Sequence, residues 1–123
     1  MTQFDLEERT FLFAEAVKNF MKDIPQTNIN RIYIDQLIRS SSSISANYLE
    51  ASDALGKNDF LYRLRISRKE AKETRLWLRL IDVNGDAALE KRKQSLLQEA
   101  TELRLILSTI IVNTQNKTST KQH

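Results

Sequence analysis

The chain has 123 residues, 41% of them hydrophobic, and this length is enough for one domain with a buried core. Cysteine is absent, which excludes disulfides, thiolate metal sites and thiol catalysis, while the formal net charge of +3 leaves a small excess of basic residues. Acidic residues near the N-terminus argue against a secretory signal, and no apolar run is long enough to cross a bilayer, so we expect a cytoplasmic protein without membrane contact.

The residues that break secondary structure divide the chain into four segments. The sequence contains only two glycines and one proline, and these three residues, Pro25, Gly56 and Gly85, are the expected breaks. We expect an all-α fold, an up-and-down antiparallel four-helix bundle over residues 1–113, followed by a flexible polar tail over residues 114–123. The expected helices cover residues 5–24, 28–54, 58–84 and 87–113.

The first two helices have clear start signals and one apolar face each. Asp5 is the expected N-cap of the first helix, with Glu8 as its capping-box partner, and Thr27 or Asn28 caps the second. Residues at three- and four-residue steps form the expected core face. In the first helix these are Leu6, Phe13, Val17, Phe20 and Ile24, and in the second they are Ile34, Leu37, Ser41, Ile44 and Tyr48.

The third and fourth helices carry the most regular heptad spacing. Asn58 is the expected N-cap of the third helix, and Gly85 its left-handed C-terminal cap. The spacing favours shallow helix crossings. The core positions are Phe60, Leu64, Ser67, Ala71, Thr74, Leu78 and Ile81, then Leu89, Leu96, Ala100, Leu103, Leu107 and Ile110.

One flank of the third helix is strongly basic. Between Lys57 and Arg79 there are eight basic and three acidic residues. Such a row can neutralise phosphates, so RNA or DNA is a natural partner; the alternative is that the row faces solvent or pairs with acids on a neighbouring helix. The candidate nucleic-acid-binding residues are Arg65, Arg68, Lys69, Lys72, Arg75 and Arg79.

Other surfaces predict contacts between copies of the chain. Outward apolar side chains on the third and fourth helices exceed what a monomer normally exposes, although scattered ones are harmless. On the second helix, Asn47 and Glu50 are candidates to order Arg39 or Lys69 in a polar cluster, unless this face is simply exposed. The candidate oligomer-interface residues are Tyr62, Leu76, Trp77, Leu80 and Leu105.

Catalytic patterns are missing from the sequence. The only histidine is His123, in the polar tail, so Glu70 and Glu73 lack the Glu-x-x-His partners of a di-iron bundle. The run of serines from Ser40 to Ser43 has no neighbouring base. We expect no enzyme, no catalytic residues, no metal and no cofactor.

The run RSSSSISANYLEASDALGKNDFLYRLRISRKEAKETRLWL resembles the bacterial four helix bundle protein family, which is encoded in intervening sequences of 23S rRNA genes. Members show A-N-x-x-E-A, then K-x-D-F, then K-E-A-x-E-T-x-x-W-L. The matching residues are Ala46, Asn47, Glu50 and Ala51, then Lys57, Asp59 and Phe60, then Lys69, Glu70, Ala71, Glu73, Thr74, Trp77 and Leu78. Arg65 and Arg68 depart from relatives, which often have small or apolar residues there.

The resemblance implies a left-handed bundle that assembles as a homopentamer. It also implies a relationship to the accessory variability protein of diversity-generating retroelements, which binds nucleic acid and works with a reverse transcriptase. The polar family positions retained here are Arg39, Asn47, Glu50, Lys57, Lys69, Glu70 and Glu73. Two hypotheses follow: a non-enzymatic oligomer that binds RNA or other nucleic acid through the basic flank, or a structural or protein-interaction scaffold, with a reverse transcriptase or another protein as partner.

Overall fold

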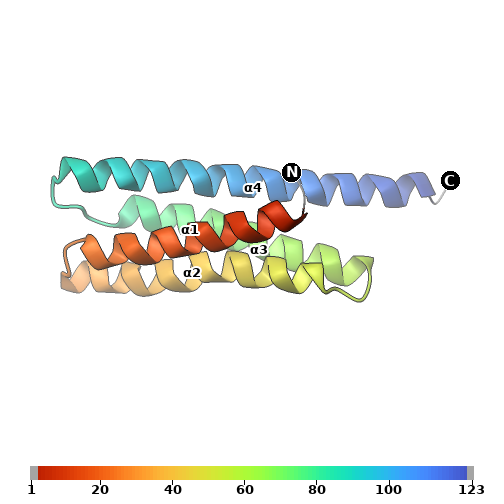
Figure 1. The fold of residues 1–123 in the computed structure, drawn as a ribbon, viewed down its shortest axis with the longest axis horizontal. Coiled ribbons are helices and arrows are strands. Elements are labelled where there is room, and N and C mark those ends of the chain that lie inside the picture. Colours follow the sequence, from red (N-terminus) through yellow and green to blue (C-terminus); the bar gives the residue numbers. More distant parts are fainter. Residues whose placement is uncertain (1–2, 122–123) are drawn as a thin grey trace.

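The four expected segments form four helices that pack in chain order. They are α1 (Gln3–Asp23), α2 (Asn28–Ser52), α3 (Lys57–Leu80) and α4 (Ala87–Lys121). The computed structural model describes residues 3–121, and the side chains of residues 5–117. Consecutive helices are antiparallel, and α4 contacts both α3 and α1, so the bundle closes on itself (Figure 1). The prediction of an all-α four-helix bundle is confirmed. Within the described residues, no helix has the length and apolar character of a membrane span.

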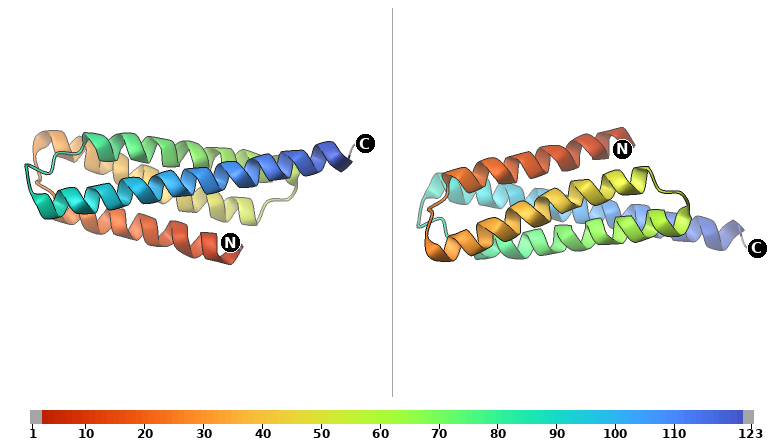
Figure 2. Two further views of the ribbon diagram at one scale, coloured as in Figure 1. Left: turned by 90° about the horizontal axis from the view of Figure 1, so that it is seen from above. Right: turned by 90° about the horizontal axis from the view of Figure 1, so that it is seen from below.

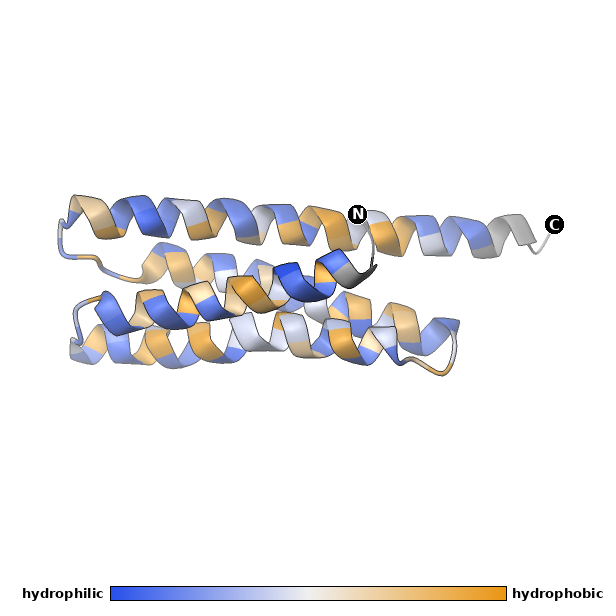
Figure 3. Cartoon of the chain, viewed as in Figure 1, coloured by the Kyte–Doolittle hydropathy of each residue, from blue (hydrophilic) through white to orange (hydrophobic). Residues whose placement is uncertain are grey.

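The core lies where the heptad pattern predicts it. Val17, Leu37, Leu64 and Leu103 are fully buried, one from each helix. Along each helix the apolar residues alternate with hydrophilic ones, as Figure 3 shows for the faces in view. Two predicted positions are replaced by their neighbours, because Leu61 rather than Phe60 and Ile111 rather than Ile110 are buried. The predicted Ile34 and Leu89 are only partly buried.

Small polar residues form the contact between α2 and α3. The Ser67 hydroxyl donates to the carbonyl of Ile44 at 2.8 Å, and the Thr74 and Ser40 hydroxyl oxygens lie 2.8 Å apart. All of these side chains are fully buried. Small side chains permit close approach of the two helices, and their hydroxyls are satisfied inside the core by a carbonyl or by each other. Ser40 therefore serves the packing of α3. Ser41, the serine predicted on the core face of α2, instead lies on the side of α1, and its buried Oγ has no partner among the described atoms.

The helix caps differ in part from the predictions. Thr27 caps α2 as expected, because its side chain accepts a hydrogen bond from the Asn30 backbone amide. The Asp5 and Glu8 capping box is wrong, since α1 begins at Gln3 and both residues lie inside the helix. Asn58 is also wrong as a cap: Gly56 occupies that position and α3 begins at Lys57.

Helix α3 ends at Leu80, four residues earlier than predicted. From Ile81 the chain is extended, which lets both Ile81 and Val83 enter the core. Gly85 has a positive φ of 76°, as a left-handed glycine should, but it lies in the connection to α4 after Asn84, whose φ is 55°.

A buried asparagine holds this connection in place. The Asn30 amide nitrogen donates to the carbonyls of Pro25, at 2.9 Å, and Asp82, at 2.8 Å. Its side-chain oxygen accepts from the Asp82 backbone amide at 3.0 Å. Asn30 is fully buried, so these bonds join the start of α2 to both neighbouring connections. This interaction explains why the chain leaves the helix at Leu80.

Helix α4 is longer than predicted and projects beyond the other three helices (Figures 1 and 2). It continues past residue 113 to Lys121, so residues 114–121 of the expected polar tail are helical. The composition of this segment is polar, but the preceding turns with Ile110 and Ile111 pack on the core and support its continuation. The last two residues of the expected tail, Gln122 and His123, lie outside the described residues.

Candidate nucleic-acid interface

The basic flank of α3 lines a groove between α3 and α4. Two adjoining hollows, of about 360 and 440 Å³, make up this groove and share Lys69, Lys72 and Arg104. We call it the cationic groove. The first hollow is lined by Arg65, Arg68, Lys69, Lys72, Arg104 and Ser108, and the second by Lys69, Lys72, Glu73, Arg75, Leu76, Arg79 and Arg104.

All six candidate nucleic-acid-binding residues line the cationic groove. Arg68 and Arg75 are partly buried, whereas the other four side chains are exposed. Two further residues, Arg104 and Ser108 of α4, were not predicted. Predicting them would require the register of α4 against α3. The one signal in the sequence is that each directly follows a core leucine, because Arg104 follows Leu103 and Ser108 follows Leu107.

The cations of the groove have no acidic partners. No acidic oxygen in the described part of the chain lies within 4.0 Å of a basic nitrogen of Arg65, Arg68, Lys69, Lys72, Arg75, Arg79 or Arg104. Glu73, the one acid lining the groove, pairs at 3.3 Å with Arg39 of α2. The alternative that these cations pair with acids on a neighbouring helix is therefore not seen.

Acid–base pairs join other helices of the bundle. Arg9 of α1 binds Glu99 of α4 through two bonds of 2.7 Å, and this hydrogen bonding raises the pKa of Arg9 above its ordinary value. Arg92 of α4 pairs with Asp23 at 2.8 Å. Charges are thus neutralised between α1 and α4 but not between α3 and α4.

Two details inside the groove indicate unused hydrogen-bonding capacity. Arg68 Nη1 lies 3.5 Å from Ser108 Oγ, which is the outer limit for a hydrogen bond. Arg75 Nε is buried and has no partner among the described atoms. At the end of the groove, Lys93 Nζ donates to the carbonyls of Arg79 and Ile81, at 3.3 and 3.0 Å, and so caps α3.

The polar family positions lie mainly between α2 and α3. Arg39 bridges Glu70, at 3.1 Å, and Glu73, and Glu70 is only 9% exposed. The predicted cluster of Asn47 and Glu50 with Arg39 or Lys69 is not seen among the described residues. Asn47 Oδ1 instead accepts from Arg63 Nη1 at 3.4 Å. The remaining positions are Glu50, which is exposed, Lys57, which is partly buried at the start of α3, and Lys69, which is exposed in the cationic groove.

The candidate interface residues are distributed over several surfaces. Trp77 is partly buried and stacks on Tyr33 of α2, with ring centroids 6.1 Å apart. Leu76 lines the cationic groove, while Tyr62 is exposed next to Arg63. Leu80 and Leu105 are exposed on α3 and α4, by 46% and 57%. They do not form one continuous patch within a single chain.

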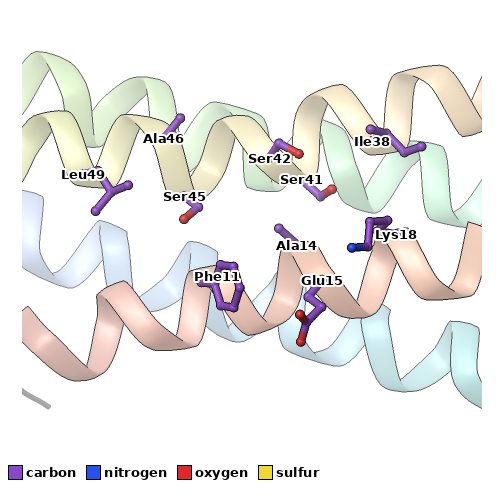
Figure 4. A pocket seen from close by; sticks show the side chains of 10 residues that line it. All are labelled: Phe11, Ala14, Glu15, Lys18, Ile38, Ser41, Ser42, Ser45, Ala46 and Leu49. Carbon is purple, nitrogen blue, oxygen red and sulfur yellow. The ribbon is translucent and has the colours of Figure 1, made fainter.

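A second groove, between α1 and α2, exposes mainly apolar surface, although Glu15, Lys18 and three serines also line it. Its volume is about 400 Å³, and small side chains from both helices form its floor. In Figure 4 the ring of Phe11 projects from α1 across from Ser45 of α2, with Leu49 and Ile38 toward the two ends. Phe11, Ile38 and Leu49 are each 42–51% exposed. We call this surface the α1/α2 groove.

Neither groove has the composition of a metal site. Within the part of the chain that the structure describes, no group of three or more histidine, cysteine, aspartate and glutamate side chains is placed to hold a metal ion. The chemistry available in the cationic groove is that of guanidinium, ammonium and hydroxyl groups, which bind oxyanions.

Comparisons with known proteins agree with this architecture. A crystal structure of a protein of unknown function from the S23 ribosomal protein family of Bacteroides thetaiotaomicron superposes with a TM-score of 0.77 and is 30% identical. The match covers 90% of this chain and 98% of that one. A comparison with curated proteins found no match. The model of the 23S rRNA-intervening sequence protein family matches residues 2–109, and the chain therefore belongs to this family.

Proposed function

We propose that this chain is a non-enzymatic, self-associating bundle that binds RNA or another nucleic acid through the cationic groove. One observation carries the proposal: seven basic side chains line a single groove without an acidic partner among the described residues. Basic residues that only maintain solubility are normally interspersed with acids, as on the other faces of this bundle. A polyanion is the ligand that this charge arrangement fits best.

The physical basis of binding is the release of counterions from the nucleic acid. Each phosphate neutralised by a lysine or arginine frees condensed cations, so the affinity falls steeply as salt is added. The partly buried Arg68 and Arg75 contribute more per charge than exposed lysines, because they are less screened by water. Arginine also offers two parallel donors to one phosphate.

A titration with structured RNA at two salt concentrations tests this proposal. We expect binding at low salt that weakens by orders of magnitude as the salt is raised about fourfold. The triple variant Arg68→Glu, Lys72→Glu, Arg75→Glu should abolish binding. The matched control, with the same change in net charge on exposed positions outside the groove, is Lys22→Glu, Arg31→Glu, Lys91→Glu.

The results separate the proposal from general electrostatic attraction. Equal loss of binding in the two triple variants would assign the attraction to net charge and overturn the proposed site. Absence of binding by the unmodified chain at low salt would overturn nucleic-acid binding altogether. Circular dichroism of both variants shows whether the helices are retained.

A second candidate function is that of a protein-interaction scaffold, and the α1/α2 groove favours it. Exposed Phe11, Ile38 and Leu49 around a floor of small residues offer an apolar surface for a helix of another protein or of a second copy. Light scattering at micromolar concentration tests self-association. A monomer in that measurement would contradict both the expected homopentamer and assembly through Tyr62, Trp77, Leu80 and Leu105.

A further inference from the structure

The shape and composition of the cationic groove carry information about the kind of nucleic acid that it takes. The groove belongs to two antiparallel helices and contains cations from both, since Arg104 of α4 faces the same hollows as Lys69 and Lys72 of α3. A ligand along the groove therefore meets a fixed row of charges on a rigid support. This inference rests on the proposed function and concerns its substrate class.

The cations of α3 repeat with helical spacing. Arg68, Lys72, Arg75 and Arg79 are four, three and four residues apart. At about 1.5 Å of rise per residue, they form a row about 16 Å long. The row is straight because α3 is one uninterrupted helix from Lys57 to Leu80. Such a row fits a backbone whose phosphates already lie in a regular array.

No aromatic side chain lines the groove in the described part of the chain. The three aromatic residues of α3 are placed elsewhere: Phe60 packs against the core, Trp77 stacks on Tyr33 of α2, and Tyr62 lies against Arg63. Proteins that hold unpaired strands depend on stacking of bases on aromatic rings, which offsets the entropy lost when the strand is ordered. The cationic groove has charge for phosphates but no platform for bases.

The first hollow of the groove, which contains Arg65 and Arg68, offers donors from both helices to one phosphate. Arg68 Nη1 lies 3.5 Å from Ser108 Oγ, a contact long enough for an oxyanion to replace with two shorter bonds. Arg104 lines the same hollow one helical turn before Ser108, so its guanidinium and the hydroxyl share a face of α4. No acidic residue lines this hollow.

We infer that the cationic groove binds the sugar–phosphate backbone of double-helical nucleic acid in preference to an unpaired strand, with Arg68, Arg104 and Ser108 holding one phosphate in the first hollow. A duplex presents its phosphates in a fixed array, so it loses little freedom on binding. It also carries a higher charge density than a single strand and releases more counterions per neutralised phosphate. Recognition by backbone shape needs no contact with base edges.

The experiment compares four ligands of about 20 nucleotides or base pairs at one low salt concentration. These are an RNA duplex, a DNA duplex of the same sequence, an RNA oligo-uridylate and a DNA oligo-thymidylate. Fluorescence anisotropy of labelled ligands gives the dissociation constants. We expect each duplex to bind at least about tenfold more tightly than the unpaired strand of the same sugar. The RNA and DNA arms show whether the sugar matters.

Variants of α4 test the phosphate site of the first hollow. Arg104→Gln should weaken duplex binding about tenfold and reduce the slope of log affinity against log salt by about one. Ser108→Ala should weaken it about threefold without changing that slope, because no charge is lost. The matched control is Arg31→Gln, which removes an exposed arginine from α2 and should leave the duplex affinity within about twofold. If Arg104→Gln loses helicity, Arg104→Lys, which keeps the charge, replaces it in the binding measurement.

Each outcome has a distinct meaning. Equal or tighter binding of the unpaired strands would overturn the duplex preference and leave nucleic-acid binding by the groove intact. Duplex binding that is unaffected by the changes at Arg104 and Ser108 would overturn the phosphate site of the first hollow. Failure of all four ligands to bind would overturn this inference together with the proposed function.

Discussion

The buried amide of Asn30 should contribute a large part of the stability of the bundle. Asn30→Ala removes the bonds to the Pro25 carbonyl and to both backbone groups of Asp82, which measure 2.8–3.0 Å. At about 1 kcal/mol each, three bonds amount to about 3 kcal/mol of unfolding free energy. For a domain of this size that loss lowers Tm by about 12 °C. Urea and thermal denaturation followed by circular dichroism measure both quantities.

A second residue of the same type on the same helix provides the control. Asn28 is exposed at the first position of α2, and Asn28→Ala should change the unfolding free energy by less than about 0.5 kcal/mol. Asn30→Asp keeps the acceptor for the Asp82 amide, loses both donor bonds and places a charge in the core, so it should destabilise more than alanine. A loss below about 1 kcal/mol for Asn30→Ala would refute the role assigned to this residue.

Three further predictions concern the α2–α3 contact, pH and the groove. Thr74→Val leaves the buried Ser40 hydroxyl unpaired and should lower the unfolding free energy by about 1–3 kcal/mol in denaturant titrations. Adding Ser40→Ala should recover part of this loss. Fully additive effects of the two substitutions would contradict their coupling. Burial, and secondarily the charge of Glu7, raises the pKa of Tyr48 above 10.0. The folded state thus holds this proton more tightly, so stability is constant below that pH and falls as pH rises through the raised pKa. Tyr48→Phe should flatten this fall in urea midpoints measured across alkaline pH, and an unchanged fall would exclude Tyr48 as its cause. Lys72→Gln should stabilise the free chain by about 0.5–1.5 kcal/mol at low salt, because Lys72 has three like-charged neighbours on α3 at three- or four-residue spacing. The same variant should bind RNA more weakly. A destabilised variant would contradict this trade-off.

Helical periodicity predicts the core of this protein because each helix buries one continuous stripe. One helix at a time was enough to assign core residues such as Phe13, Leu37, Leu64 and Leu103, without tertiary information. The helix ends were harder to predict. Asp5 and Asn58 have suitable chemistry for caps, but the helices begin before them, and a start signal in sequence does not exclude an earlier start.

Residues whose role depends on another segment were not found from the sequence. Asn30 looks like an ordinary polar residue in the first turn of a helix. Two of the three bonds that satisfy its buried amide come from Asp82, which is fifty-two positions away in the sequence. Arg104 sits in a regular heptad of α4, and its contribution to the cationic groove depends on the rotation of α4 against α3. The basic flank of α3 itself was found, because its spacing is a property of one helix.

The distribution of charge favours the proposed ligand site over a merely solvated face. On α3 the basic residues form six like-charged pairs at three- or four-residue spacing: 65–68, 65–69, 68–72, 69–72, 72–75 and 75–79. At about 0.2–0.5 kcal/mol each, they oppose folding by about 1–3 kcal/mol. This bundle places acids beside bases elsewhere, at Arg9 and at Arg39. A polyanion in the groove removes the repulsion on binding, so the same charges that weaken the free chain strengthen the complex. The repulsion in the free chain and the proposed affinity for a polyanion therefore both follow from the same row of basic residues on α3. These charges are unfavourable in the free chain and favourable when they face phosphate groups.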